Sequence, residues 1–460
     1  MRLRRAGMLA AAAVVCAAGC TSARPPGGAA GGGPATPASG AATAPAAGAD
    51  WPVFHANAAR TGAADAPPAG PLRVAWTRRL DGAVYGQPLI IGGLVVAATE
   101  NDSVYGLDRA SGRILWRSHV GTPVPLSALP CGDIDPLGIT GTPAYDPGTG
   151  LVYAVAEKTG FRHVLYGFSL TGRVRLVRDL PTPDGHPRYD QQRPALAIAA
   201  GRVYVAFGGL EGDCGPYIGS VVGAPASGRG PLISYRLPTR RAGAIWGTGG
   251  LVASPGGTLY ASVGNGAATS GRYDGTDSVI ALSPGLRRTG LFAPVTWAAD
   301  NARDLDLGSM SPALLAGGRI LADGKRGTAY LLNAARLGGI GGQIAQAPVC
   351  PAFGAPSVRG TVAYVPCQAG GMAAVDTAGG RLRVLWRGPT TAQGSPVTGG
   401  GAVWVADWDA GTLYELSQAT GRVRFRIGLG GPLPHFASPS LSGSLAFVGT
   451  MTGVTAISGA

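Results

Sequence analysis

The sequence predicts an all-β fold, an eight-bladed β-propeller built of four-stranded antiparallel blades. Three observations predict it: one hairpin pattern recurs along the chain, helix-period patterns are scarce, and the 460 residues include 77 Gly and 37 Pro. The clearest hairpin is 103–116, where Val104 and Leu107 alternate with other residues, a turn ends at Gly112, and a returning strand carries Trp116. Weaker copies lie at 279–285, 373–386 and 413–425. Because one hairpin cannot bury its own faces, repeated hairpins imply stacked copies with a shared core.

Prolines give the number of repeats, because a proline suits the first residue of a strand, where its missing N–H is tolerated. Seven apolar strands begin with such a proline, at Pro88, Pro143, Pro194, Pro312, Pro356, Pro396 and Pro439. The gap between Pro194 and Pro312 is far longer than the others, and strands at 246–253 and 258–263 fill it with an unmarked repeat. Eight units result.

Each unit contains up to four strands, which in the first unit are 88–91, 94–99, 103–107 and 113–119. The last unit has strands at 435–441, 444–449 and 453–458 and then lacks its outer strand. The segment 72–80 precedes the first unit, and its Trp76 is placed as Trp116 is in the first unit. We expect this N-terminal strand to complete the last blade, because that pairing closes the ring and removes two sheet edges.

The first fifty residues have the pattern of an export segment. In residues 1–19, three arginines precede the apolar run 6–18, which is the layout of a secretory signal and is too short to span a bilayer. The end of this segment, Ala17-Ala18-Gly19-Cys20, resembles a bacterial lipobox, in which the cysteine receives a lipid. Since alanine stands where leucine is commonest, secretion without a lipid stays open. Residues 21–49 are almost wholly Ala, Gly, Pro, Thr and Ser, which predicts a disordered tether.

The domain prediction is therefore a signal peptide at 1–19, a lipidated Cys20 with its tether at 20–49, and a propeller at 50–460. The predicted location is the extracytoplasmic face of the cell membrane as a lipoprotein, or secretion. We expect a monomer.

Four cysteines follow the export segment: Cys131, Cys214, Cys350 and Cys367. An exported chain favours disulfides, and four cysteines allow three pairings. We favour Cys350 with Cys367, which is a short closure, and Cys131 with Cys214, which would tie loops of two consecutive repeats. The spacing of these cysteines does not indicate a zinc site.

The formal net charge of +13 raises the question of a polyanionic partner. Much of this charge comes from arginines that follow the turn glycines: Arg113, Arg173, Arg175, Arg381, Arg383, Arg422 and Arg424. These are expected on the outer strands of separate repeats, spread around a rim. Without a basic stripe and interleaved aromatics, the sequence predicts no nucleic acid partner.

The hairpin motif then points to a family. Residues 106–116 resemble an Ala-x-Asp-x-x-Thr-Gly-Lys-x-x-Trp repeat, with Arg113 for the lysine. The opening 51–55 and the later 60–62 resemble the segment that precedes such propellers. The chain from 51 to 460 thus resembles the quinoprotein family of eight-bladed propellers. That family includes dehydrogenases dependent on pyrroloquinoline quinone (PQQ) and catalytically silent PQQ-like lipoproteins.

The resemblance implies a cofactor site in the middle blades. Glu211, in 208–211, and Asn265, in 263–265, match residues that bind calcium in the dehydrogenases. Trp246, in 243–249, matches the tryptophan that forms the floor under the quinone. If the protein is a quinoprotein, calcium and PQQ are its implied cofactors.

Two further stretches extend this resemblance. Asp304 and Asp306, in 303–307, match the segment that holds the general base, and Lys325, in 323–328, matches the lysine that contacts the quinone. Ordinary structural explanations also stand for all of these residues: loop amides bound by Glu211, a left-handed turn at Asn265, packing of Trp246 between blades, loop caps at Asp304 and Asp306, and a solvated pair of Lys325 with Arg326.

One expected feature of the dehydrogenases is absent. They cap the quinone with a disulfide between neighbouring cysteines followed by Arg-Gly, but residues 131–138 contain only Cys131 and no arginine. We therefore prefer a binding or assembly platform in the cell envelope, whose funnel takes an envelope protein or a small ligand and whose Cys20 lipid reaches the membrane. The alternative is a PQQ- and calcium-dependent dehydrogenase of an alcohol or sugar.

Overall fold

The computed structural model describes residues 50–65, 70–368 and 370–459. The predicted signal peptide, the lipidated Cys20 and the tether lie outside these residues. Within the described residues, no helix has the length and the apolar character needed to cross a membrane.

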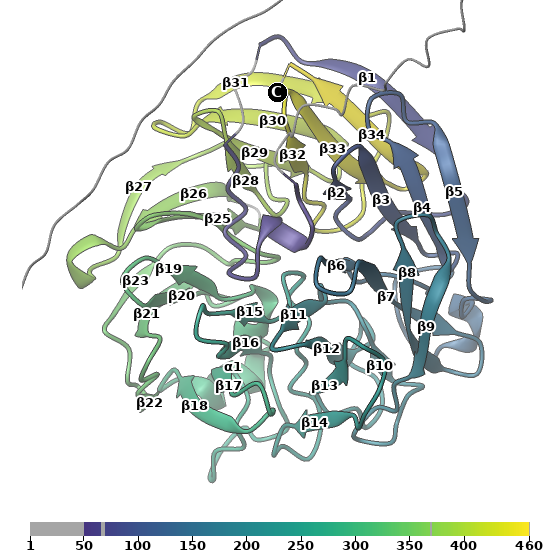
Figure 1. The fold of residues 1–460 in the computed structure, drawn as a ribbon. Coiled ribbons are helices and arrows are strands. Elements are labelled where there is room, and N and C mark those ends of the chain that lie inside the picture. Colours follow the sequence, from purple (N-terminus) through teal and green to yellow (C-terminus); the bar gives the residue numbers. More distant parts are fainter. Residues whose placement is uncertain (1–49, 66–69, 369, 460) are drawn as a thin grey trace, which may run out of the picture. The chain divides into compact units, whose positions relative to one another are not determined.

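Eight antiparallel sheets are arranged as the blades of a propeller (Figure 1). Blade 1 contains β2 (Leu89–Ile91), β3 (Leu94–Thr99), β4 (Ser103–Asp108) and β5 (Ile114–His119). Blade 2 contains β6 (Ala144–Asp146), β7 (Leu151–Lys158), β8 (Arg162–Ser169) and β9 (Val174–Asp179). Blade 3 contains β11 (Ala197–Ala199), β12 (Arg202–Gly209), β13 (Ser220–Pro225) and β14 (Ile233–Arg236). Blade 4 contains β15 (Val252–Ala253), β16 (Leu259–Val263), β17 (Ser278–Leu282) and β18 (Arg288–Ala293).

The other four blades follow the same plan. Blade 5 contains β19 (Ala313–Leu315), β20 (Arg319–Ala322), β21 (Thr328–Asn333) and β23 (Ala345–Pro348). Blade 6 contains β24 (Ser357–Arg359), β25 (Val362–Cys367), β26 (Gly371–Asp376) and β27 (Arg383–Arg387). Blade 7 contains β28 (Val397–Gly399), β29 (Ala402–Asp407), β30 (Thr412–Ser417) and β31 (Val423–Gly428). Blade 8 contains β32 (Ser440–Ser442), β33 (Leu445–Thr450), β34 (Gly453–Ser458) and β1 (Arg73–Arg79).

The predicted all-β propeller is confirmed, with small additions. Blade 3 gains the short strand β10 (Asp190–Gln191), and blade 4 gains β22 (Gly339–Ile340), which pairs in parallel with β18. The described chain has one α-helix, α1 (Trp297–Arg303), and four 3₁₀ turns: η1 (Phe54–Ala56), η2 (Leu126–Ala128), η3 (Leu307–Ser309) and η4 (Ala378–Gly380).

The N-terminal strand closes the ring as predicted. β1 pairs antiparallel with β34, from Arg73 opposite Ser458 to Arg79 opposite Gly453. This pairing supplies the outer strand that the last repeat lacks, so the first and last parts of the described chain share one blade.

A tryptophan and a glycine connect neighbouring blades. The indole Nε1 of Trp116, on β5, donates a hydrogen bond to the Leu170 carbonyl in the next blade at 2.9 Å. A Cβ atom at Gly172 would lie 2.6 Å from the Trp116 ring, so only glycine leaves room for the indole. Trp76 and Trp386 make the corresponding bonds to the carbonyls of Arg109 and Gln418. The repeated Gly and Trp of the hairpin motif are thus a contact between blades.

Burial follows the position of each strand within its blade. The middle strand β3 is buried along nearly its whole length, whereas the outer strand β5 is largely exposed. The seven arginines expected on outer strands are all exposed. The core therefore consists of apolar layers between adjacent blades, and the rim carries charge.

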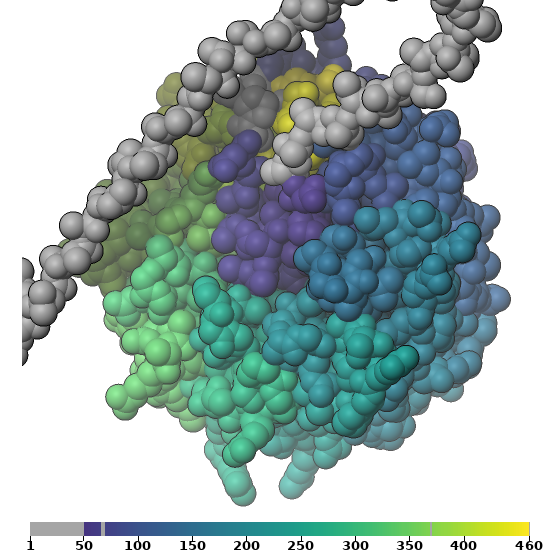
Figure 2. All heavy atoms as spheres, viewed as in Figure 1, coloured from purple at the N-terminus to yellow at the C-terminus, as the bar shows by residue number. Residues whose placement is uncertain are grey.

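Residues 51–64 fill the centre of the ring, and we call them the plug (Figures 1 and 2). Backbone hydrogen bonds join plug residues to Ile90, Tyr145, Ala253, Val358 and Thr398, which lie in or beside the inner strands of five blades. The buried Arg60 guanidinium adds a bond to the Leu196 carbonyl at 2.6 Å, and the His55 ring adds a bond to the Ser438 hydroxyl at 3.1 Å. The plug thereby connects blades that are far apart in sequence.

Candidate functional site

A cavity of about 660 Å3, which we call the mouth cavity, is formed by loops from several blades. It is lined by all six residues that the sequence singled out: Glu211, Trp246, Asn265, Asp304, Asp306 and Lys325. They come from the β12–β13, β16–β17 and β20–β21 loops and from the connections that lead into β15 and β19. The fold thus brings together residues that are up to about a hundred positions apart in sequence.

Asp306 is the centre of a polar network in this cavity. Its Oδ2 accepts a hydrogen bond from Trp246 Nε1 at 2.8 Å, and its Oδ1 accepts one from the Gly308 backbone N–H at 2.6 Å. The Lys325 ammonium lies 3.7 Å from Asp306 Oδ2 and 2.7 Å from Asp304 Oδ1. Lys325 Nζ also lies 5.8 Å from the centre of the Trp246 ring, within range of a cation–π contact. Asp306, a candidate base, therefore contacts both Trp246, the candidate quinone floor, and Lys325, the candidate quinone-binding cation.

Burial and charge set the protonation of this network. Burial raises the pKa of the Asp306 carboxyl to about 6, and the Lys325 charge and the Trp246 hydrogen bond keep it from rising further. Burial lowers the pKa of Lys325, but the negative charges of Asp306 and Asp304 outweigh burial and hold this pKa above its ordinary value. Lys325 is therefore an ammonium at neutral pH, whereas the pKa of Asp306 lies close to neutral pH.

Aromatic side chains that the sequence did not single out form another wall of the mouth cavity. The rings of Phe353 and Phe436 are stacked, with centres 6.3 Å apart and planes 10° apart, and each lies 6.1 Å from the Trp246 ring. Phe436 has a φ of 64°, a left-handed conformation that is rare for a bulky residue. Phe353 lies in the connection that leads into β24. The sequence placed Phe436 in a strand at 435–441, but β32 begins only at Ser440, so Phe436 belongs to the loop before it.

A second charged group lies beside this aromatic wall. The Arg193 guanidinium is 3.2 Å from Asp133 and lies 5.9 Å from the centre of the Phe436 ring. His435 Nδ1 is 3.6 Å from the other Asp133 oxygen. Asp133 lies in the stretch 131–138 that was compared with the quinone cap, which was the only sequence signal for this group. The mouth cavity thus presents two cations, several carboxylates and an aromatic surface.

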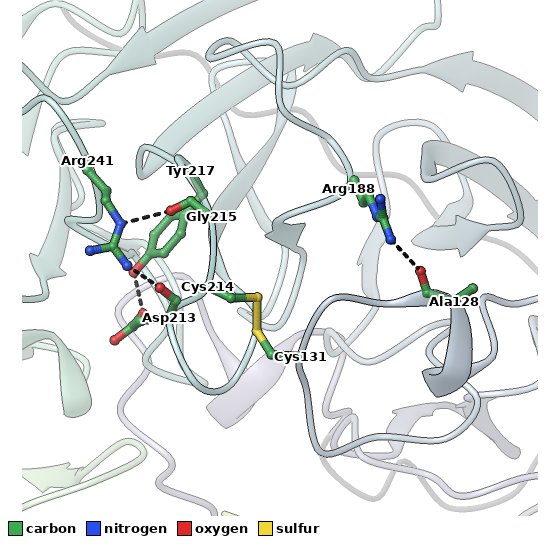
Figure 3. Close-up of a disulfide and its surroundings, with 8 residues drawn as sticks. All are labelled: Ala128, Cys131, Arg188, Asp213, Cys214, Gly215, Tyr217 and Arg241. Atoms are coloured by element: carbon green, nitrogen blue, oxygen red, sulfur yellow. Dashed lines mark hydrogen bonds between the residues drawn. A yellow bond between two sulfur atoms is a disulfide. The ribbon is translucent and has the colours of Figure 1, made fainter.

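The loop that carries Glu211 is held by a disulfide and by Arg241 (Figure 3). Cys131 is bonded to Cys214, and Arg241 donates hydrogen bonds to the carbonyls of Gly215, at 2.8 Å, and Asp213. The Tyr217 hydroxyl donates to Asp213 Oδ1 at 2.5 Å. The loop is therefore ordered, while the Glu211 side chain is exposed at the cavity wall.

Both predicted cysteine pairings are confirmed, because Cys350 is bonded to Cys367 as well. One detail of the prediction is wrong. Cys131 lies in the connection from blade 1 to blade 2 and Cys214 lies in blade 3, so this disulfide reaches one blade further than two consecutive repeats. The reason is the long connection 120–143, whose Ile134 and Leu137 pack against Leu210 of blade 3.

The ordinary structural explanations have mixed outcomes. Asp306 does cap a turn, η3, as one of them proposed. Asn265 does not adopt a left-handed backbone conformation. Lys325 and Arg326 are not a solvated pair, because Arg326 binds Asp300 at 2.6 Å while Lys325 binds the two aspartates of the cavity. Among the described residues, none donates a hydrogen bond to Glu211 that would make it a loop cap.

The residues of the mouth cavity do not fit a calcium-bound quinone. Calcium takes six to eight oxygen ligands. The resemblance supplies only Glu211 and Asn265 as calcium ligands, and both oxygens of the nearby Asp306 already accept protein hydrogen bonds. Throughout the described part of the chain, no three His, Cys, Asp or Glu side chains are grouped closely enough to hold a metal ion. Cys131 is bonded to distant Cys214, so the cap of neighbouring cysteines is also missing.

Comparison with known proteins identifies the family. The family model described as outer membrane protein assembly factor BamB matches residues 72–260 and 294–426, which is more than half of the chain. The chain belongs to this family. The BamB family match covers strands of all eight blades, the last through β1 alone, and most of the lining of the mouth cavity.

Solved structures share the fold of this BamB-family chain. Quinohemoprotein alcohol dehydrogenase from Comamonas testosteroni matches 89% of this chain and 80% of its own, at 15% identity and a TM-score of 0.67. A europium-containing methanol dehydrogenase matches 89% and 98%, at 15% identity and a TM-score of 0.67. BamB from Moraxella catarrhalis matches 84% and 99%, at 16% identity and a TM-score of 0.60. No curated protein sequence matches the chain significantly.

The fold is thus common to assembly factors and dehydrogenases, and it alone does not choose between them. The BamB family match and the two disulfides agree with an extracytoplasmic location, because structural disulfides persist in oxidising compartments.

Proposed function

We propose that this BamB-family protein is a binding and assembly platform of the cell envelope, which receives a segment of an envelope protein in the mouth cavity. One observation carries the proposal: the two carboxylates that the enzyme alternative offers as a base both have protein partners. Asp306 is bound by Trp246, Gly308 and Lys325, and Asp304 is bound by Lys325 at 2.7 Å. A general base must reach a substrate proton, and these carboxylates already have protein partners.

The mouth cavity has the properties of a recognition surface. Its volume, about 660 Å3, lies within the range of ligand pockets. Trp246, Phe353 and Phe436 offer large, stiff apolar surface, and such residues with arginine dominate binding energy at interfaces. Arg193 and Lys325 lie at the edges of this surface and can orient the polar groups of a bound segment. We propose that the chain is exported and anchored through a lipid on Cys20, or secreted.

The experiment is site-specific photocrosslinking in cells that express the full chain. A photoreactive residue replaces Glu211, which is exposed at the mouth cavity, or Arg113, which is exposed on the outer rim. The platform predicts a discrete adduct with an envelope protein from position 211 and none from position 113. Phe436→Ser in the same chain should reduce the adduct at position 211. The same adduct from both positions, or none from either, contradicts a platform at the mouth.

A PQQ- and calcium-dependent dehydrogenase of an alcohol or sugar is the alternative function. It is supported by the convergence of the six family-matched residues at one cavity. It is opposed by the engaged Asp306, the incomplete calcium ligand set and the missing cap.

A further inference from the structure

A second cavity, of about 830 Å3, lies between blades 3 and 4 and is called here the arginine groove. Its walls carry Arg240, Arg272 and Arg288, which come from the β14–β15 connection, the β16–β17 loop and strand β18. The three arginines were not among those that the sequence placed around the rim. The fold therefore gathers positive charge at a concave site that the distribution of turn arginines did not predict.

The guanidinium groups of this groove have no acidic partner. Arg240, Arg272 and Arg288 are exposed, and none of them forms an ion pair with any residue of the described chain. Elsewhere, several arginines are paired, including Arg117 with Asp81 and Arg162 with Asp179. The groove therefore holds three arginines that form no ion pair within the described chain, and Asp274 is the one acidic residue of its lining.

Asp274 is the acidic residue of the lining, and it is used to shape the loop. Its Oδ2 accepts hydrogen bonds from Thr239 Oγ1 at 2.8 Å and from the Ala268 backbone N–H at 3.1 Å. Its Oδ1 accepts a hydrogen bond from Thr276 Oγ1 at 2.6 Å. These bonds involve both oxygens, so Asp274 holds the β16–β17 loop in place. The groove lining therefore carries one negative charge against three positive charges.

The loop is also fastened to helix α1. Asn301, on α1, donates to the Ala268 carbonyl at 2.6 Å and accepts from the Gly266 backbone N–H at 2.7 Å. The ring of Tyr273 packs against Trp297, with ring centres 4.9 Å apart. A preorganised surface loses little conformational entropy when it binds a partner. The only α-helix of the described chain therefore serves to hold one wall of the arginine groove.

We propose that the arginine groove binds an acidic protein segment, rich in Asp and Glu. The neighbourhood is strongly basic, because residues 227–291 contain seven arginines and two aspartates. The three groove arginines come from three separate elements and are all exposed, which suits several carboxylates along an extended segment better than one enclosed phosphate. Arginine pairs with carboxylates through two parallel N–H bonds, which adds orientation to charge.

This site is separate from the mouth cavity, although both share the β16–β17 loop: Asn265 lines the mouth cavity and Tyr273 lines the groove. The ligand chemistry of the groove is set by its own arginines. The inference therefore stands or fails independently of the function proposed for the mouth.

The test measures the binding of a fluorescent Glu-Gly repeat peptide to the folded protein by anisotropy, at low and at physiological salt. We expect saturable binding that salt weakens, since exposed charge pairs are screened. The triple variant Arg240→Gln, Arg272→Gln, Arg288→Gln should lose about tenfold in affinity, because each exposed pair contributes a modest amount. The matched control, Arg113→Gln, Arg173→Gln, Arg422→Gln, removes the same charge from the outer rim and should keep the affinity.

Three results would overturn the proposal: no peptide binding, an equal loss in both triple variants, or binding to phosphatidylglycerol vesicles without binding to the peptide. The second would mean that net charge alone attracts the peptide, and the third would assign the groove to a lipid headgroup. All six arginines are exposed, so thermal unfolding should show both variants to be as stable as the parent chain.

Discussion

Replacement of Lys325 tests the polar network of the mouth cavity. Lys325 Nζ lies 3.7 Å from Asp306 Oδ2. At an effective dielectric constant of about 20, this attraction is about 4 kcal/mol, or about three pKa units. Because the Lys325 side chain is 22% exposed, water screens part of its attraction to Asp306. We therefore expect Lys325→Met to raise the pKa of Asp306 from about 6 by about one to two units.

The assay is a pH titration of tryptophan fluorescence, restricted to the part that Trp246→Phe removes. Trp246 reports on Asp306 because its indole N–H donates to the carboxylate, and that hydrogen bond weakens when the carboxyl is protonated. The midpoint should lie near pH 6 in the parent chain and near pH 7 to 8 in Lys325→Met. The matched control is Lys158→Met, which removes the other lysine, whose ammonium binds the Val120 carbonyl. A midpoint that stays near 6 in Lys325→Met would refute the network.

Stability gives a second readout of the same change. The folded-state pKa of Asp306, about 6, is above its ordinary value of 3.8, so the folded protein keeps a proton that the unfolded chain releases. Stability therefore falls as pH rises between these two values. In Lys325→Met the fall should continue to the higher pKa, so that the free energy of unfolding at pH 8 drops by about 1.4 kcal/mol for each unit gained.

Three other predictions concern the fold. Gly172→Ala should cost about 1–3 kcal/mol more than Gly201→Ala in urea unfolding, because both glycines have positive φ but only Gly172 faces an indole; equal losses would contradict the blade contact. Removing the Cys131–Cys214 disulfide, which spans 83 residues, should lower the free energy of unfolding by about 4.5 kcal/mol, and removing Cys350–Cys367, which spans 17 residues, should lower it by about 3 kcal/mol. A larger loss for Cys350–Cys367 would argue against chain entropy as the cause. Burial raises the pKa of Glu100 to about 8 and of Asp190 to about 9, so the urea concentration at the unfolding midpoint should fall as pH rises from 5 to 9. Glu100→Gln should make this decrease with pH less steep. An unchanged pH dependence would mean that Glu100 does not contribute.

Much of the fold could be predicted from sequence because its signals are local. A hairpin such as 103–116 shows its strands, its turn glycine and its tryptophan within fourteen residues, and a proline precedes most inner strands. Ring closure by β1 followed from counting strands in the last repeat. The plug was not predicted as such, because its bonds to Ile90 and Thr398 depend on where the blades meet in space.

The candidate site was predicted in part. The six residues that line the mouth cavity were found through short motifs of the family resemblance, and each motif lies in one loop. Phe353, Phe436 and Arg193 complete the cavity from other loops and have no repeat pattern. The engagement of Asp306 by Trp246, across 60 positions, depends on side-chain geometry that no spacing rule contains. The arginine groove was missed for the same reason.

The central claim is that the mouth cavity binds a protein segment because its polar groups are engaged with one another and do not take a quinone. The most direct measurement is a titration of the purified chain with PQQ and calcium, followed by dye reduction with a panel of alcohols and aldoses. We predict no saturable binding of PQQ and no turnover. Saturable binding with turnover that Glu211→Ala abolishes, in a chain whose thermal unfolding is unchanged, would contradict the claim and assign the protein to the dehydrogenases.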